Sequence, residues 1–195
     1  GLSVAKKANM VPTQMELGGK DACIVFPDAD VRLAADAVVK GGFSYSGQRC
    51  TAVKLVLAFP EVADELVELV CAKIEALRVG RPEEDADITA LVSKRSADFV
   101  QGLVEDAVAK GASLKQPWRR EDNLVWPALV DHVTSDMRLA WEEPFGPVVP
   151  VVRVTSEAEA LRFVNESKYG LQGCVFTRDV DAAIRVADLM ETGTV

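Results

Sequence analysis

Two segments of this sequence carry side chains that could do covalent chemistry. Residues 47–51 read GQRCT and hold a soft nucleophile, Cys50, while residues 15–20 read MELGGK and hold a carboxylate, Glu16. A thiolate adds readily to a carbonyl carbon, and a carboxylate can take a proton from the water that later releases the product. Gly47 can adopt backbone angles that a Cβ would forbid, which lets a substrate approach the thiol closely. A cysteine after a glycine, taken alone, favours a buried and unreactive thiol, so it is the pairing of the two segments that indicates catalysis.

A third segment completes the set. Residues 142–148 read EEPFGPV, and residues 43–51 extend the nucleophile segment to FSYSGQRCT. Together with residues 15–20, these motifs make the chain resemble the aldehyde dehydrogenase superfamily over essentially all of its 195 residues. The resemblance implies that Cys50 is the nucleophile and that Glu16 is the base that activates water.

The resemblance also implies how the chain would meet a nicotinamide cofactor. Glu143 is expected to bind the hydroxyls of the nicotinamide ribose. Phe145 is expected to offer an aromatic edge to the nicotinamide, and the backbone of Leu17 is expected to contact its amide. Glu142 offers a neighbouring carboxylate, and without the family the segment 144–147 indicates only a rigid turn.

The catalytic roles have a physical basis in the residue types. A carboxyl held near apolar groups and the pair Gly18 and Gly19 can accept a proton from water at neutral pH, as Glu16 would. Without its motif, a single glutamate at a turn indicates a solvated residue. The backbone amide of Cys50 could donate to the oxyanion of a carbonyl adduct, and the family's second donor, an asparagine side chain, would lie upstream of this chain.

Within the superfamily, two segments point to one branch. Residues 48–54 (QRCTAVK) and 136–141 (DMRLAW) resemble the non-phosphorylating, NADP-dependent glyceraldehyde-3-phosphate dehydrogenases. Arg49, next to the nucleophile, suits a phosphorylated substrate, since a guanidinium forms charge-assisted hydrogen bonds with phosphate oxygens. The alternative is an arginine that pairs with a neighbouring carboxylate. The branch implies oxidation of glyceraldehyde 3-phosphate to 3-phosphoglycerate with NADP, through a cysteine thioester and without inorganic phosphate.

Two other functions stay open at this stage. The chain could belong to another NAD(P)-dependent aldehyde dehydrogenase that acts on a small unphosphorylated aldehyde, or to a non-catalytic structural module derived from the family. The presence of Cys50, Glu16 and Glu143 together argues against the second. NAD also stays possible as the cofactor, because the contacts to the 2′-phosphate would belong to another domain.

The apolar pattern predicts an α/β fold with a largely parallel sheet flanked by helices. Strands are expected at 22–26, 55–59, 124–130, 148–154 and 173–177, and helices at 28–41, 61–78, 93–110, 156–165 and 179–191. The helix at 93–110 is expected to turn five apolar side chains inward, which are Phe99, Leu103, Val104, Ala107 and Val108.

Residues 1–195 are expected to form one catalytic domain. The sequence has no GxGxxG fingerprint for a dinucleotide. The resemblance implies that the cofactor-binding domain precedes Gly1, that further family sequence follows Val195, and that the full-length enzyme is a homotetramer.

Composition narrows the partners and the compartment. With 22 basic and 30 acidic residues, the net charge is −8, which argues against binding to nucleic acid or to an anionic membrane surface. No stretch approaches the ~20 apolar residues that span a bilayer, and the first residues lack the layout of a signal peptide. Four cysteines without CxxC or Cys-His clustering favour reduced thiols in a cytoplasmic protein and no metal site. The sole histidine, His132, indicates a structural or surface residue.

Overall fold

Strands and helices alternate along most of the chain, as the sequence predicts, but four short strands follow one another between α4 and α5. The computed structural model describes residues 1–195. In chain order the elements are α1 (Leu2–Lys7), β1 (Asp21–Val25), α2 (Val31–Phe43), the 3-10 turn η1 (Ser44–Gly47), β2 (Val53–Ala58), α3 (Pro60–Glu75), η2 (Pro82–Glu84), α4 (Lys94–Ala109), β3 (Ser113–Leu114), β4 (Arg120–Glu121), β5 (Leu124–Val125), β6 (Ala128–Asp131), α5 (Arg138–Trp141), β7 (Val148–Arg153), α6 (Glu157–Asn165), β8 (Gly173–Phe176) and α7 (Val180–Leu189).

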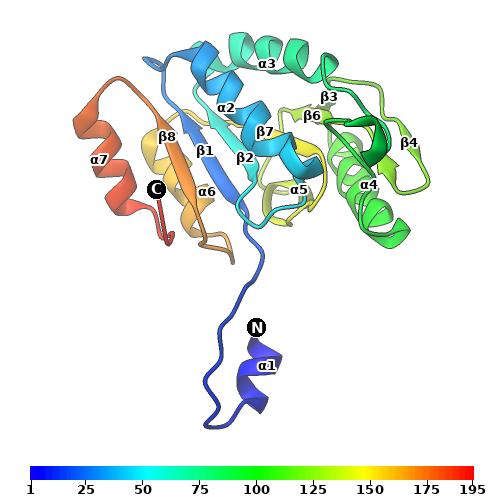
Figure 1. Cartoon of the computed structure of the whole chain (residues 1–195). Coiled ribbons are helices and arrows are strands. Elements are labelled where there is room, and N and C mark those ends of the chain that lie inside the picture. The colour runs from blue at the N-terminus through cyan, green and yellow to red at the C-terminus, as the bar shows by residue number, and fades with distance from the viewer.

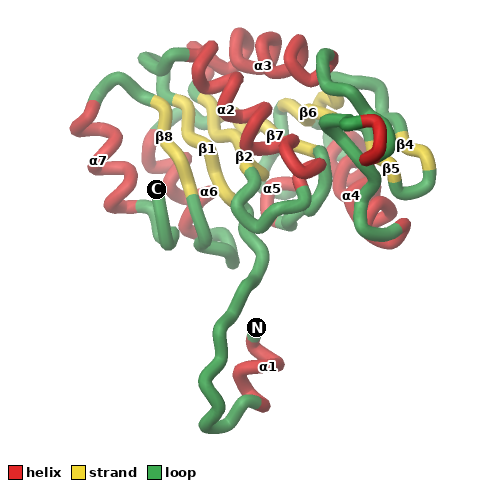
Figure 2. Tube along the Cα trace, viewed as in Figure 1, coloured by secondary structure: helices red, strands yellow, loops and turns green.

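Six of the strands form one sheet in the order β3-β6-β7-β2-β1-β8 (Figure 2). Every neighbouring pair in it is parallel except β3 with β6, which is antiparallel at the edge. The short strands β4 and β5 pair separately as a hairpin. The expected α/β fold with a largely parallel sheet is therefore confirmed.

The central strands are buried because helices cover both faces of the sheet. In Figure 1, α2 and α3 lie over one face, while α5 and α6 lie behind it. β1 is buried at every residue, and β2 and β7 are buried at all residues but one. Strands that are covered on both faces carry continuous apolar runs instead of alternating patterns, which is why the sequence reveals them as short hydrophobic segments.

Side-chain caps set where four of the helices begin, and at α7 the cap is Asp179, which accepts from Asp181 N at 2.9 Å. The Asp30 side chain accepts from Leu33 N at 3.1 Å at the start of α2, and Ser93 caps α4 in the same way. At α6, Ser156 Oγ accepts from Glu159 N at 3.1 Å, as the capping pattern predicts. The Glu159 carboxylate returns to the backbone one residue earlier, at Thr155 N, 2.8 Å away.

Two predicted core positions of α4 are wrong. Phe99 is 41% exposed and Val108 is 45% exposed. The buried stripe of α4 consists of Ala97, Val100, Leu103, Val104 and Ala107. These positions recur every three or four residues and make one narrow contact line with the sheet, so Phe99 and Val108 stand at its flanks.

Prolines affect two of the expected strands differently. The strand expected at 124–130 is divided, because β5 pairs with β4 while β6 joins the main sheet, with Trp126 and Pro127 between them. Pro150 lies inside the predicted strand at 148–154 and does not interrupt it, since it remains within β7, opposite Val130. Pro127 lacks the N–H that would continue a ladder, so the chain changes partner there.

The first residues stand apart from the rest of the molecule. In Figure 1, α1 and the extended chain after it project away from the sheet and its helices. α1 buries no residue, and the side chains become buried only from Gly19 onward. None of the helices combines the length and the apolar character that crossing a bilayer requires.

Candidate active site

The three motifs of the sequence meet at one end of the sheet, where the central strands begin. The segment with Glu16 precedes β1, the segment with Cys50 precedes β2, and the segment with Glu143 precedes β7. In the sheet these strands are neighbours in the order β7-β2-β1, and they run parallel. Their amino ends therefore lie side by side and bring the motifs together. Open α/β sheets more commonly bind ligands beyond the carboxyl ends of their strands.

Backbone contacts between the motifs are close enough to require glycine. Gly19 N donates to Glu143 Oε1 at 3.2 Å. A Cβ on Gly19 would collide with the carbonyl oxygen of Cys50, and a Cβ on Gly18 would collide with Glu143 Oε2. The two glycines of the first motif thus leave the space that the nucleophile loop and the Glu143 carboxylate occupy.

The loop before Cys50 has an unusual backbone. Tyr45, Ser46 and Gly47 all have positive φ angles, of 55°, 57° and 69°. A Cβ on Gly47 would collide with the carbonyl oxygen of Gly146, in the third motif. The predicted need for glycine at this position is confirmed, but the group that approaches it in the structure is the backbone of Gly146.

Side chains of the same loop tie it to the segment before α4. Ser46 Oγ accepts from Thr89 N at 2.8 Å, and Gln48 Oε1 accepts from Val92 N at 2.9 Å. Ser46 is almost completely buried. These bonds hold a loop in which Cys50 itself is partly exposed.

Glu143 lies in a polar contact that the sequence does not reveal. Its Oε1 atom lies 3.0 Å from Lys54 Nζ, and its side chain is 14% exposed. Phe145 is 38% exposed, which agrees with its expected exposure, and its ring centre lies 5.9 Å from the same Nζ. Glu143 and Phe145 border a hollow of about 320 Å³ that Phe99 also lines.

Glu16 and Leu17 lie where the chain leaves the body of the molecule. Leu17 is 55% exposed, and the Glu16 side chain is exposed with Gln14 as its hydrogen-bond partner, at 3.4 Å. The apolar surroundings expected around Glu16 are not present, because residues before Gly19 pack against nothing in the sheet. The structure brings Gly18 and Gly19 to Cys50 and leaves the Glu16 carboxylate in solvent.

Arg49 is held without a carboxylate. Its Nη2 donates to the carbonyl of Gly41 at 3.5 Å, and its guanidinium carbon lies 5.2 Å from the centre of the Tyr45 ring. Its Nε atom is buried and has no partner. The alternative of an arginine paired with a neighbouring carboxylate is therefore not what the structure shows. The Arg49 guanidinium thus has one hydrogen bond, to a carbonyl oxygen, and its charge is not paired with an acid.

Two further ionisable groups, at the end of the first motif and the start of β1, are buried near the site. Lys20 is 5% exposed and donates to the carbonyl of Leu139 at 2.7 Å. Burial lowers the pKa of Lys20 well below its usual value, and the charge of Lys54 lowers it further. Asp21 is 4% exposed, and its Oδ1 accepts from Gln172 N at 3.2 Å while its Oδ2 has no partner. Burial raises the pKa of Asp21 to about 6.

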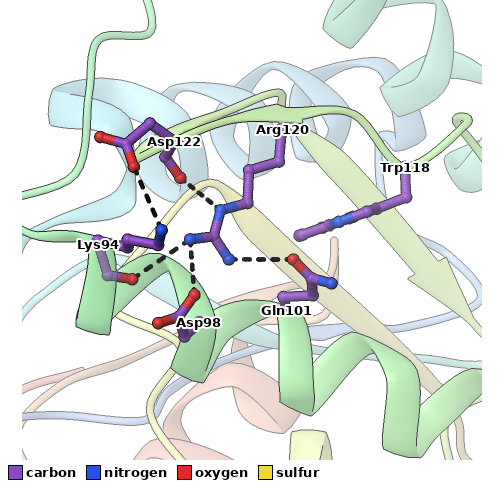
Figure 3. A pocket seen from close by; sticks show the side chains of 6 residues that line it. All are labelled: Lys94, Asp98, Gln101, Trp118, Arg120 and Asp122. Carbon is purple, nitrogen blue, oxygen red and sulfur yellow. Dashed lines mark hydrogen bonds and ion pairs between the residues drawn. The ribbon is translucent and has the colours of Figure 1, made fainter.

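A larger hollow of about 510 Å³ lies between α4 and the β4–β5 hairpin, away from these motifs. Figure 3 shows its six lining side chains, which are Lys94, Asp98, Gln101, Trp118, Arg120 and Asp122. Arg120 pairs with Asp98 at 2.7 Å and donates to Gln101 at 3.0 Å, and Lys94 lies 3.9 Å from Asp122 (Figure 3). Each cation already faces an acid, so this cluster joins the hairpin to α4.

The histidine and the three other cysteines lie outside the site. His132 is 55% exposed and lies 3.5 Å from Asp131 Oδ2 at the end of β6. Cys23 and Cys174 are opposite each other on β1 and β8, and Cys71 packs against the core. All four cysteines are free thiols.

Comparisons with known proteins agree with this geometry. A profile described as "Aldehyde dehydrogenase family" matches residues 1–195. An NADP-dependent glyceraldehyde-3-phosphate dehydrogenase of Arabidopsis thaliana is 63% identical over the whole chain, which spans 39% of that protein.

Solved structures show the same fold. The NADP-dependent glyceraldehyde-3-phosphate dehydrogenase of Bacillus halodurans C-125, complexed with NADP, matches with a TM-score of 0.98 and 50% identity. A salicylaldehyde dehydrogenase of Pseudomonas putida G7 matches with a TM-score of 0.94 and 39% identity. Both matches cover 100% of this chain and 41% of the other chain.

The Gly47 contact can be tested against a matched glycine. Gly111 also has a positive φ, of 100°, but a Cβ there would meet nothing within 4 Å. Gly47→Ala and Gly111→Ala should both lose ~1–2 kcal/mol of unfolding free energy through backbone strain. Only Gly47→Ala should add a steric loss and also slow the alkylation of Cys50, as followed by urea unfolding and peptide mass spectrometry. Equal effects of the two changes would contradict a contact with Gly146.

Burial of Asp21 predicts a dependence of stability on pH. Because its folded pKa is raised from 3.8 to about 6, ionisation of Asp21 destabilises the folded state as the pH rises through this range. Asp21→Asn should therefore gain roughly 1–3 kcal/mol relative to the wild type between pH 3.5 and pH 8, measured by denaturant unfolding.

Asp28 provides the control of opposite sign for that measurement. The Thr177 hydroxyl lowers the pKa of Asp28, so Asp28→Asn should lose stability relative to the wild type as the pH rises. If the difference in unfolding free energy between Asp21→Asn and the wild type did not change across this pH range, burial would not raise the pKa of Asp21.

Proposed function

Because the chain belongs to the aldehyde dehydrogenase family, we propose that the protein oxidises glyceraldehyde 3-phosphate to 3-phosphoglycerate with NADP and without inorganic phosphate. The observation that carries the proposal is the position of Arg49. Arg49 directly precedes Cys50 in the sequence, and no carboxylate pairs with its guanidinium. The identity to NADP-dependent glyceraldehyde-3-phosphate dehydrogenases over the whole chain supports the same substrate.

The chemistry begins with Cys50. Its thiolate adds to the aldehyde carbon and forms a carbon–sulfur bond, while the aldehyde oxygen becomes an oxyanion that the Cys50 N–H can stabilise. The cofactor, when bound, accepts the hydride of the former aldehyde carbon. The carbon is left as a thioester on Cys50. Water then attacks it, Glu16 takes a proton from this water, and the acid is released with return of the thiolate.

The surroundings of Glu143 suit a carboxylate that binds the hydroxyls of the nicotinamide ribose. Its Oε1 is anchored by Gly19 N and Lys54, and its Oε2 lies in the space left by Gly18, which a Cβ would fill. One oxygen is thus fixed, and the carboxylate keeps a second oxygen as an acceptor for a hydroxyl. Phe145 borders the same hollow and would present its ring edge to the nicotinamide. Glu143 and Phe145 therefore fit the nicotinamide ribose of the cofactor.

Glu16 needs a change of surroundings to act as the base. It is exposed and lies two residues from the Gly18 and Gly19 contacts with the site. The Gly18 and Gly19 contacts hold the chain next to the Glu143 and Cys50 segments, and Glu16 closely precedes them along the chain. The role therefore stands on the motif and on the short distance along the chain.

The expected location and assembly are part of the proposal. Four free thiols suit the reducing conditions of the cytoplasm. A homotetramer is expected from the family, and size measurement of the full-length protein would test it.

Replacing the nucleophile tests the reaction itself. In the full-length protein, Cys50→Ser should reduce aldehyde oxidation by several orders of magnitude, because a positioned nucleophile is lost. Binding of NADP, followed by calorimetry, should change little. Cys71→Ser is the matched control and should keep its activity. Turnover above a tenth of the wild-type value in Cys50→Ser would contradict the assignment.

Replacing the base separates the two halves of the reaction. Glu16→Gln should leave the first burst of NADPH and slow the later steady rate, because only thioester hydrolysis needs the proton acceptor. Stopped-flow absorbance of NADPH measures both phases. Loss of the burst itself would place Glu16 before hydride transfer.

Arg49 tests the substrate. Arg49→Leu should raise KM for glyceraldehyde 3-phosphate by ~10- to 100-fold, as expected when a charge-assisted pair of about 1.5–3 kcal/mol is lost. KM for unphosphorylated glyceraldehyde should change little. A parallel rise for both aldehydes would show that Arg49 positions the thiol loop, and the protein would then be an aldehyde dehydrogenase for small unphosphorylated substrates.

A further inference from the structure

Lys54 is a buried cation beside the nucleophile, and the proposed reaction uses it only to anchor Glu143. It lies on β2, and its side chain is 2% exposed. Its Nζ atom donates to the carbonyl oxygens of Arg49 at 2.5 Å and Cys50 at 2.8 Å, and it lies 3.0 Å from Glu143 Oε1. An ammonium group has three N–H donors, so each donor has one acceptor.

The first of these contacts fixes a peptide plane. The carbonyl of Arg49 and the N–H of Cys50 belong to the same peptide unit, which is planar and trans. The two groups therefore point in opposite directions. When Lys54 holds the Arg49 oxygen on the inner side, the Cys50 N–H must face away from Lys54.

The Cys50 N–H is also free to bind. It donates to no backbone carbonyl of the chain, whereas the neighbouring Gln48 N donates to Tyr45 at 3.0 Å and Ala52 N donates to Arg49 at 3.3 Å. An uncommitted N–H on the nucleophile residue is placed to meet the oxyanion that forms when the thiol attacks a carbonyl.

We infer that Lys54 is a positioning residue that aims and polarises the Cys50 N–H as a donor to the oxyanion. The inference rests on the proposed role of Cys50. The positively charged ammonium that donates to the carbonyl oxygen polarises the peptide unit, and this polarisation strengthens the N–H of the same unit as a donor. The third contact of Lys54, with Glu143, holds the ammonium in place from the side of the third motif.

A purely structural cation would give the same contacts but different kinetics. Such a lysine would only hold the loop, and its loss would change every reaction of the thiol alike. Two reagents separate the cases. Attack of Cys50 on p-nitrophenyl acetate forms a carbon–sulfur bond, passes through an oxyanion and releases p-nitrophenolate. Attack on methyl methanethiosulfonate forms a sulfur–sulfur bond, releases methanesulfinate and develops no oxyanion at carbon.

The experiment compares these rates at Cys50 in the full-length protein without cofactor. Release of p-nitrophenolate and peptide mass spectrometry give the two rate constants, and their ratio cancels changes in thiolate fraction and access. Lys54→Met should slow the ester reaction by about 30- to 100-fold and the thiosulfonate reaction by less than about threefold, since losing one oxyanion donor costs about 10²–10³. Lys54→Gln, which keeps N–H donors without the charge, should fall between.

Lys20→Met is the matched control. It removes the other buried ammonium of this region, which donates to Leu139 and not to the peptide unit of Cys50. Its ratio should stay within about threefold of the wild type. If Lys54→Met does not fold, Lys54→Gln decides by the same ratio, where a fall of at least about fivefold is required.

The results separate the inference from the proposed function. Equal slowing of both reagents, or an unchanged ester rate, overturns the role of Lys54. A normal effect of Lys54→Met on the ester, combined with no oxidation of glyceraldehyde 3-phosphate by the wild type, supports the role and overturns the proposed substrate. Lack of any ester reaction at wild-type Cys50 overturns both.

Discussion

The parallel pairing of β7, β2 and β1 is the constraint on which the rest of the site depends. Each of these strands is preceded by one motif, and parallel neighbours place their amino ends at the same edge. The pairing is held by strands whose side chains are almost entirely buried between two layers of helices. A shift of one strand along another would move its motif by the length of a residue or more, about 3.3 Å, which is larger than the tolerance of a reacting group.

Bringing three segments to one edge crowds the backbone and buries charge. Glycines at positions 18, 19 and 47 relieve the crowding, since a Cβ at any of them would collide with a neighbouring motif. The buried charges are answered within the site: Lys54 faces Glu143 and two carbonyls, and Lys20 faces one carbonyl. Burying an ammonium is unfavourable unless it is paired or hydrogen-bonded. These contacts are therefore needed for the three segments to pack together. Asp21, with one unpaired oxygen, is the group for which this compensation is incomplete.

The site also shows how stability and chemistry are divided between elements. The sheet and α2 to α6 supply the packing, while the reactive loop, η1 and the extended residues before β1 contribute little to the core. Bonds from Ser46 and Gln48 to the segment before α4 anchor the loop that carries Cys50, and Lys54 holds the Cys50 carbonyl. Glu16 lacks such bonds and lies on the segment that leaves the molecule. The nucleophile is therefore preorganised, whereas the base is placed only by its distance along the chain.

The sequence by itself determined the reactive residue types, the three motifs and the longer helices and strands, because those depend on local patterns of apolar, capping and turn residues. The short elements α1, α5, β3 and β4 were not predicted. It also indicated a need for glycine at position 47. Strand order was decided only by the tertiary structure, since it depends on which buried faces pack together across long separations. The same holds for Lys54, whose contacts come from residues 49, 50 and 143. It also holds for Phe99, which the helical period placed inward but which is exposed and lines the hollow beside Glu143. A local pattern shows which face of an element is apolar, but not which neighbour will cover it.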